Sequence, residues 1–285
     1  MPPKASTSSI GTSHHVNPGD LENIPVDGPL LVVANHPLGM QDALALLQLI
    51  GSVRRDARIL GNDWLATVPQ LGQLLLPVDV FGKGAASRLR GIYRALENGE
   101  ALIVFPAGEV SRVRPGGVRD GRWSDGFARL SLRSKTPVLP VHVSARNSAM
   151  FYGLSMLAKP LSTAMLPREA VAPGKRRIGF SIGALVGAEE LAQRSGGSPK
   201  QAAKLMRRHV YRVGQHRGLV FGGQAPLALP EPAAEVAAEL ARGEKLADLG
   251  DGKQAWLFMG TPDSAVMREI GRLRELTFRK VGEGT

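Results

Sequence analysis

Two residues near the start of the chain, His36 and Asp42, have the types and the spacing of a general base and the carboxylate that orients it. An imidazole held by a carboxylate at one nitrogen can take the proton of a hydroxyl with the other nitrogen, which prepares the hydroxyl oxygen to attack a carbonyl. A less specific interpretation is that Asp42 only stabilises the start of a helix and that His36 is an ordinary residue at a strand end. The strand and the helix predicted around the two residues help to decide between these interpretations.

These two side chains lie on either side of a predicted connection between a strand and a helix. The apolar run 30–34 predicts a buried strand, which Asn35-His36-Pro37 ends because proline has no N–H to donate to a neighbouring strand. A helix over 41–51 follows. His36 therefore follows the carboxyl end of a strand, the edge where α/β sheets bind ligands, and Asp42 lies in the first turn of the next helix.

A second polar stretch, FPAGEVSR at 105–112, resembles the first. In both, a proline follows an apolar run, here 101–105, and polar side chains come after that run. In a parallel sheet both strand ends open on the same edge, so we expect Glu109 and Arg112 to line one crevice with His36. The alternative is an ordinary loop with a surface ion pair.

Strands and helices alternate along most of the chain, which predicts an α/β fold with a largely parallel central sheet flanked by helices. Strands are expected at 30–34, 57–61, 75–81, 101–105, 137–143 and 176–182. Helices are expected at 41–51, 84–98 and 125–134, in one or two short pieces within 62–76, and from Ser198-Pro199 onward, where the helix is basic. The segment 148–167 is rich in Met, Leu and aromatic residues and is interrupted by Pro160, so we expect a pair of core helices or a surface that contacts lipid rather than a membrane span.

The composition of the chain suggests four segments. Residues 1–20 are rich in Ser, Thr and Pro and are expected to be disordered, and residues 21–221 form the main domain. Residues 222–232 have the composition of a linker. Residues 233–285 are expected to form a small α/β appendage of two helices and one strand, at 255–259.

Bulk composition limits the classes of function. The 285 residues include no cysteine, which excludes disulfides, thiolate nucleophiles and cysteine–zinc sites. We find neither the apolar segment of a signal peptide nor a run long enough to cross a membrane, so we expect a cytoplasmic protein. The net charge of +11 indicates an anionic partner, namely a membrane surface, a nucleic acid or an acidic carrier protein.

Four blocks, NHPLGMQD, LLLPVDV, FPAGEVSR and PVLPVHV, resemble in order and spacing those of the glycerolipid acyltransferase superfamily. The similarity covers about residues 25–215 and is closer to the haemolysin-like branch, which includes lyso-ornithine-lipid O-acyltransferases. The resemblance implies the fold of that superfamily and O-acyl transfer from acyl carrier protein or coenzyme A thioesters to a lysolipid hydroxyl. It also implies direct attack without an acyl-enzyme, no bound cofactor and no metal, and a place on the inner face of the cytoplasmic membrane.

The resemblance assigns roles to residues of this chain. His36 matches the general base and Asp42 the aspartate that orients it, while the block at 105–112 matches the part that binds the head group of the acceptor. Backbone N–H groups near Gly39 or Gly108 are expected to stabilise the oxyanion. The expected substrate-binding residues are Asn35, Gly39, Phe105, Pro106, Ala107, Gly108, Glu109 and Arg112.

Departures from the commonest superfamily pattern concern the acceptor. Five residues, rather than four, separate His36 from Asp42, as is usual in the haemolysin-like branch. Ala107 stands where members that form phosphatidic acid have glutamate, and Val78-Asp79 stands where an arginine that contacts glycerol phosphate is expected. Loss of a bidentate phosphate contact disfavours lysophosphatidic acid and favours a lyso-amino-acid lipid such as lyso-ornithine lipid. Lysophosphatidic acid remains the alternative acceptor.

The last residues of the chain carry a second resemblance. Residues 268–285 are similar to the opening of the GNAT-like N-acyltransferases that make lyso-ornithine lipid. This implies a possible N-acyltransferase partner, or the start of an N-acyltransferase-like domain in the appendage.

Two other classes of function compete with this interpretation. Residues 179–183 fit the G-x-S-x-G pattern of serine hydrolases, but the apolar alternation around Ser181 predicts a strand that runs straight through it, which a nucleophile elbow does not allow. The basic helix after Ser198 could belong to a non-catalytic membrane- or nucleic-acid-binding protein. Because no zinc-finger, RRM or P-loop signature is present, we expect no nucleic-acid partner.

Overall fold

The computed structural model of the chain describes residues 8–9, 12–61, 72, 74–77, 85–114, 117–145 and 176–280. The chain divides into two compact units, Met1–Pro226 (unit 1) and Leu227–Thr285 (unit 2). The predicted boundaries at 221 and 232 lie on either side of this division. Each unit is considered by itself.

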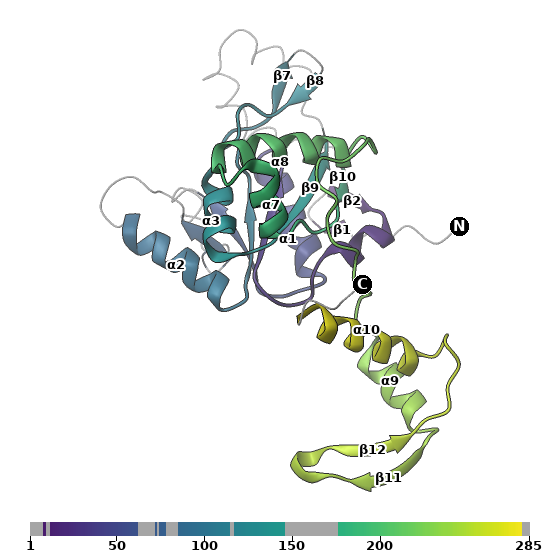
Figure 1. The fold of residues 1–285 in the computed structure, drawn as a ribbon. Helices are drawn as coiled ribbons and strands as arrows, with labels where there is room; N and C mark the ends of the chain where they lie inside the picture. The colour runs from purple at the N-terminus through teal and green to yellow at the C-terminus, as the bar shows by residue number, and fades with distance from the viewer. Residues whose placement is uncertain are drawn as a thin grey trace. The chain divides into compact units, whose positions relative to one another are not determined.

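Unit 1 is built on a mostly parallel sheet, which confirms the predicted α/β class (Figure 1). The strand order among the described residues is β1-β2-β10-β9-β3-β6-β4-β5, and neighbours are parallel except in the pairs β1–β2 and β9–β10. The strands are β1 (Ser8–Ser9), β2 (Thr12–Val16), β3 (Leu30–Ala34), β4 (Ala57–Gly61), β5 (Leu75–Pro77), β6 (Ala101–Val104), β9 (Val138–Ser144) and β10 (Arg176–Ile182).

Strand β3 lies in the middle of the sheet, paired in parallel with β6 on one side and β9 on the other. All five of its side chains are fully buried. Leu30, Val32 and Ala34 point into one hydrophobic cluster, and Leu31 and Val33 point into a second on the opposite face. A strand buried on both faces needs a continuous apolar run rather than an alternating one, and this is why the sequence signal was strong.

Helices cover both faces of the sheet. Helix α1 (Met40–Gly51) packs into the first cluster through residues such as Leu46 and Ile50. The second cluster receives residues from α2 (Ala85–Glu97), α3 (Gly126–Ser134), α7 (Ala188–Ser195) and α8 (Pro199–Val213). Helices α3, α7 and α8 lie beside one another in Figure 1 and contact one another. As predicted, α8 starts at Ser198-Pro199, and the Ser198 hydroxyl caps it by accepting a hydrogen bond from the N–H of Gln201.

Two parts of unit 1 differ from the sequence prediction. Within residues 1–20, which the sequence analysis expects to be disordered, the polar strand β2 pairs in parallel with β10, Val16 is buried, and a 3-10 helix, η1 (Pro18–Asn23), begins. The long loop after β6 contains a small antiparallel hairpin, β7 (Arg112–Arg114) and β8 (Gly117–Arg119), which the sequence analysis did not predict. The segment 148–167, Val78-Asp79 and most of 62–76 lie outside the described residues.

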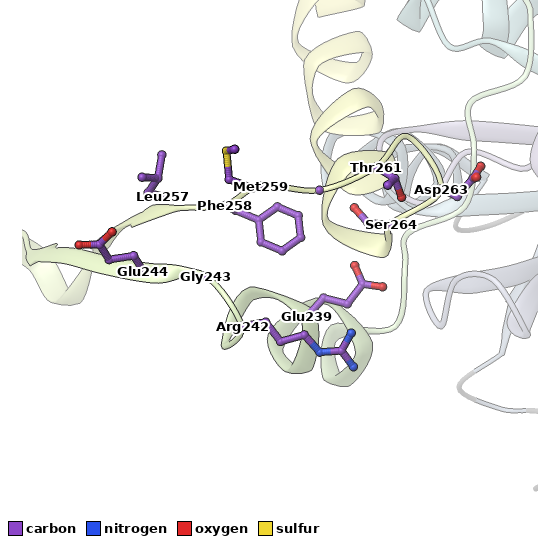
Figure 2. A pocket seen from close by; sticks show the side chains of 11 residues that line it. Glu239, Arg242, Gly243, Glu244, Leu257, Phe258, Met259, Thr261, Asp263 and Ser264 are labelled. Atoms are coloured by element: carbon purple, nitrogen blue, oxygen red, sulfur yellow. The ribbon is translucent and has the colours of Figure 1, made fainter.

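Unit 2 contains α9 (Ala233–Leu240), β11 (Glu244–Asp248), the 3-10 helix η4 (Gly250–Gly252), β12 (Gln254–Leu257) and α10 (Ala265–Lys280). The predicted appendage with a single strand is wrong in one respect, because β11 forms an antiparallel hairpin with β12. A cavity of about 470 Å³ lies between the end of α9, the end of β12 and the start of α10, and Figure 2 shows Glu239, Phe258 and Ser264 around it.

None of the helices that the structure describes combines the length and the apolar character of a membrane-spanning segment. Within the same described ranges, no three His, Asp or Glu side chains gather in the way a metal site requires.

Candidate active site

The strand-end histidine and the helix-start aspartate meet as the sequence predicts. Nδ1 of His36 lies 2.8 Å from Oδ1 of Asp42, whose side chain is fully buried, while the His36 side chain is 18% exposed. The oxygen lies off the direction of the ring N–H, so the contact is not a well-aligned hydrogen bond, and it is an ion pair when the imidazole is protonated. The other carboxylate oxygen of Asp42 accepts a hydrogen bond from the N–H of Leu38 at 2.7 Å. With Nδ1 facing Asp42, Nε2 is the nitrogen that can receive a proton from a substrate.

Between these two residues, the loop turns back through Gly39. Its φ of +82° and ψ of −127° belong to a region that only glycine adopts readily, so a side chain here would strain the turn that brings Asp42 to His36. An added Cβ would meet Cγ2 of Val110 at 3.7 Å, which places the 105–112 loop directly against this turn.

Asn35 anchors the end of β3 to β9. Its side-chain amide donates to the carbonyl of Val143 at 2.9 Å and accepts from the N–H of Val143 at 2.7 Å, and the residue is buried. Because both polar atoms are used in this way, the side chain predicted to bind substrate holds the strand end that carries His36.

The 105–112 loop packs against His36, as the parallel arrangement of β3 and β6 predicts. The Phe105 ring lies 4.2 Å from the imidazole, centroid to centroid, and the N–H of Ser111 donates to the carbonyl of His36 at 2.7 Å. Pro106 is buried, and its carbonyl accepts from the N–H of Ser124 at 2.8 Å. The two loops therefore meet at His36, through Phe105 and Ser111. That Glu109 and Arg112 line one crevice with His36 stays a prediction.

The rest of this loop forms a turn followed by a loose charge cluster. Ala107 is half-buried, and Gly108 has a positive φ of +63°. The Glu109 carboxylate lies 3.7 Å from the Arg112 guanidinium and 3.8 Å from that of Arg114, distances of ion pairs rather than hydrogen bonds. Arg112 is mostly buried, whereas Glu109 is more than one-third exposed.

One buried carboxylate behind His36 is absent from the sequence prediction. Asp120 has no exposed surface, and its oxygens accept from the backbone N–H of His36 at 3.2 Å, from the Ser111 hydroxyl, and from the Trp123 indole N–H at 2.8 Å. Asp120 follows β8 in a loop rich in Gly and Arg, where neither hydrophobic periodicity nor a motif distinguishes it. The Trp123 indole three residues later is the one nearby sequence signal of a buried hydrogen-bond acceptor.

Charges around the imidazole favour its protonated form. Burial alone lowers the pKa of His36, but the negative charge and close contact of Asp42, together with the charge of Asp120, outweigh it and raise that pKa above 6.5. Burial also raises the pKa of Asp120, which the hydrogen bonds from Ser111 and Trp123 oppose. The arrangement suits a histidine that must hold a proton for part of a reaction cycle.

The structure does not have the nucleophile elbow at Ser181 that the serine hydrolase alternative requires. Ser181 lies inside β10, which continues through Ile182 and pairs with β9 in regular register. A nucleophile elbow needs a sharp turn into a helix directly at the serine.

Comparison with known proteins shows which family model and which relatives this chain matches. A family model described as acyltransferase matches residues 7–216. A lyso-glycine lipid O-acyltransferase of Bacteroides thetaiotaomicron is 36% identical over 143 residues, which cover 50% of this chain and 52% of that protein. Its counterpart in Phocaeicola vulgatus is 34% identical over 142 residues, covering 50% and 51%. The chain thus spans about half the length of these curated relatives.

Among solved structures, the 1-acyl-sn-glycerophosphate (LPA) acyltransferase PlsC of Thermotoga maritima matches 71% of this chain and 73% of its own, with 22% sequence identity and a TM-score of 0.46.

Proposed function

The chain belongs to the acyltransferase family, and from this premise we propose that it transfers a fatty acyl group from an acyl thioester to the hydroxyl of a lysolipid. The observation that carries the proposal is the pairing of His36 with Asp42, at 2.8 Å, at the carboxyl edge of the central strand. The proposed donor is acyl carrier protein or coenzyme A, with no bound cofactor.

In the proposed reaction, Nε2 of His36 takes the proton of the acceptor hydroxyl as its oxygen attacks the thioester carbonyl carbon. A C–O bond forms, and the carbonyl oxygen carries the negative charge of the tetrahedral intermediate. The C–S bond then breaks, and the leaving thiolate takes the proton from the imidazolium. Asp42 keeps Nδ1 protonated and stabilises the imidazolium between the two steps. No covalent acyl-enzyme is formed.

Of the two oxyanion donors expected from the sequence, the structure favours one. The N–H of Gly108 is already used, since it donates to the carbonyl of Phe105 at 3.1 Å. None of the described residues accepts from the N–H of Gly39, the residue that directly precedes helix α1. We therefore assign the oxyanion to the N–H of Gly39, where the positive end of the helix dipole adds to the effect.

The proposed acceptor is a lyso-amino-acid lipid. The two relatives described above are named for lyso-glycine lipid. Lyso-ornithine lipid shares with lyso-glycine lipid a carboxylate head group and an acceptor hydroxyl without a nearby phosphate. Near His36, the loose cluster of Glu109, Arg112 and Arg114 offers both signs of charge to such a head group. We further propose that the enzyme works as a peripheral protein on the inner face of the cytoplasmic membrane, with an N-acyltransferase as a possible partner.

The test is acyl transfer in vitro with acyl carrier protein and coenzyme A thioesters and three acceptors side by side: lyso-glycine lipid, lyso-ornithine lipid and lysophosphatidic acid. Wild type is compared with His36→Ala and with His216→Asn, a control at an exposed histidine whose φ of +50° asparagine tolerates. We expect transfer to an amino-acid lipid by wild type and His216→Asn, and a loss of about a hundredfold or more in His36→Ala.

Other outcomes distinguish the alternatives. Transfer only to lysophosphatidic acid would retain His36 as the base and contradict the proposed acceptor. Equal activity of His36→Ala and wild type would reject the proposed mechanism. Absence of transfer to all three acceptors by folded wild-type protein would contradict the proposed reaction.

A further inference from the structure

The backbone of His36 is held at both of its polar groups. Its carbonyl accepts from the N–H of Ser111 at 2.7 Å, and its N–H donates to Asp120 at 3.2 Å. The Ser111 hydroxyl also donates to the same oxygen of Asp120. These three contacts close a ring of hydrogen bonds through His36, Ser111 and Asp120, and such a ring restricts the peptide that sets the direction of the imidazole.

Only a carboxylate satisfies all the donors that converge at this point. The His36 N–H, the Ser111 hydroxyl and the Trp123 indole N–H all donate to the two oxygens of Asp120. A carboxylate accepts at both oxygens and donates nothing, whereas an asparagine would turn an NH₂ group toward at least one of these donors. Burying a charge is costly unless it is well hydrogen-bonded, and these donors offset much of that cost.

The main chain on both sides of this carboxylate is tied to helix α8. The N–H of Asp120 donates to the Tyr211 hydroxyl at 2.8 Å, and its carbonyl accepts from the Arg207 guanidinium at 2.7 Å. Arg207 and Arg119 both lie over the Tyr211 ring. Arg207, one of the basic residues of the helix for which the sequence analysis considered nucleic-acid binding, thus supports the loop behind His36.

We propose that Asp120 is a positioning residue for His36, which fixes its backbone and adds a second negative charge behind the imidazole. The inference rests on the proposed function, in which His36 is the base. The charged and titratable groups that face His36 and Asp120 are Asp42 from α1, Arg207 and Tyr211 from α8, and Arg119 from β8. Removing the charge of Asp120 leaves Asp42 as the carboxylate in contact with the ring.

The experiment compares Asp120→Asn with wild type in two independent ways. The first is the NMR titration of the His36 ring without substrate, whose midpoint we expect to move to lower pH. The second is steady-state acyl transfer, in which we expect kcat to fall at least about tenfold while KM stays within about twofold, because a displaced base affects the reaction more than binding. Asp20→Asn is the control, since the Asp20 carboxylate also accepts a backbone N–H, from Ile182 at 3.0 Å.

The proposal is overturned if Asp120→Asn keeps the His36 midpoint of wild type and also has the kcat of the Asp20→Asn control. If Asp120→Asn does not fold by circular dichroism, Ser111→Ala replaces it, because it removes one donor to Asp120 but keeps the backbone N–H bonded to His36. We expect several-fold lower kcat with unchanged KM in that variant, and wild-type kcat would overturn the proposal. If wild type transfers no acyl group, the proposed function fails, while a downward shift of the His36 midpoint still supports the positioning role.

Discussion

At the scale of residues, the site combines a partly exposed histidine with a buried carboxylate that holds it. The His36 side chain is 18% exposed, enough to meet a substrate, whereas Asp42 is fully enclosed and satisfied on its second oxygen by Leu38. A buried carboxylate with one fixed partner has little freedom to rotate away. The imidazole therefore keeps one tautomer, the one with its free nitrogen toward the substrate.

Activity is expected to depend on pH through His36. Because the pKa of His36 lies above the usual 6.5, the imidazole stays protonated to a higher pH than an ordinary histidine does. While protonated, it cannot accept a proton from the substrate. We expect kcat/KM to be constant at alkaline pH and to fall with unit slope as pH decreases through that pKa, measured from about pH 5 to pH 9. A midpoint at or below 6.5 would contradict this sign.

Replacing Asp42 with asparagine should damage catalysis while preserving the helix start. The amide oxygen can still accept from Leu38, but its NH₂ group then faces Nδ1 of His36 and favours the tautomer with the proton on Nε2. We expect kcat to fall roughly 10²- to 10⁴-fold with KM little changed. Glu97→Gln, at an exposed carboxylate near the end of α2, should keep wild-type kcat. A less than threefold loss in Asp42→Asn would count against Asp42 as the orienting group.

At the scale of elements, a single buried arginine connects three turns of unit 1. Arg54 pairs with Asp56 through two hydrogen bonds of 2.8 and 2.5 Å and donates to the carbonyls of Pro25 at 3.2 Å and Gly99 at 2.6 Å. It is 3% exposed. The turns before β3, before β4 and before β6 are thereby held together at the edge opposite the site.

We expect Arg54→Met to lower the free energy of unfolding by about 2 kcal/mol, because two partly buried carbonyls lose their donor and Asp56 loses its partner. The neighbouring Arg55 is exposed, so Arg55→Met should change stability by less than about 0.5 kcal/mol. Urea unfolding followed by circular dichroism measures both. Equal stability of the two variants would show that the cluster contributes little.

The sequence predicts those elements whose signals are local. Strand β3 and helix α1 have long apolar patterns of their own, and His36 and Asp42 are joined by one short loop, so their meeting follows from that connection. Strand β2 has no apolar pattern that would reveal it in the sequence. It forms by backbone pairing with β10, which lies more than 150 residues later. Asp120 is likewise 84 residues from His36, and its role depends on contacts that only the tertiary fold creates.

At the scale of the whole molecule, charge is unevenly divided along the chain. Residues 225–285 hold 8 Lys and Arg against 10 Asp and Glu, so the net charge of +11 comes from the residues before them. In unit 1, the exposed residues Lys204 and Arg208 lie on helix α8, whose opposite face is buried in the core. An acyltransferase whose acceptor is a lipid has a use for a basic face of this kind, because anionic head groups attract it to the substrate.

We expect unit 1 to carry the protein to anionic membranes. Full-length protein should co-sediment with vesicles of phosphatidylglycerol and phosphatidylcholine, more weakly at high salt, and weakly with phosphatidylcholine alone. Neutralising two exposed charges of α8 in the double variant Lys204→Gln, Arg208→Gln should weaken partitioning roughly 30-fold, at about 1 kcal/mol for each charge. The matched double variant in unit 2, Arg242→Gln, Lys253→Gln, removes the same charge from exposed positions and should bind like wild type. Equal losses in both variants would mean that net charge alone, rather than the basic face of α8, determines membrane binding.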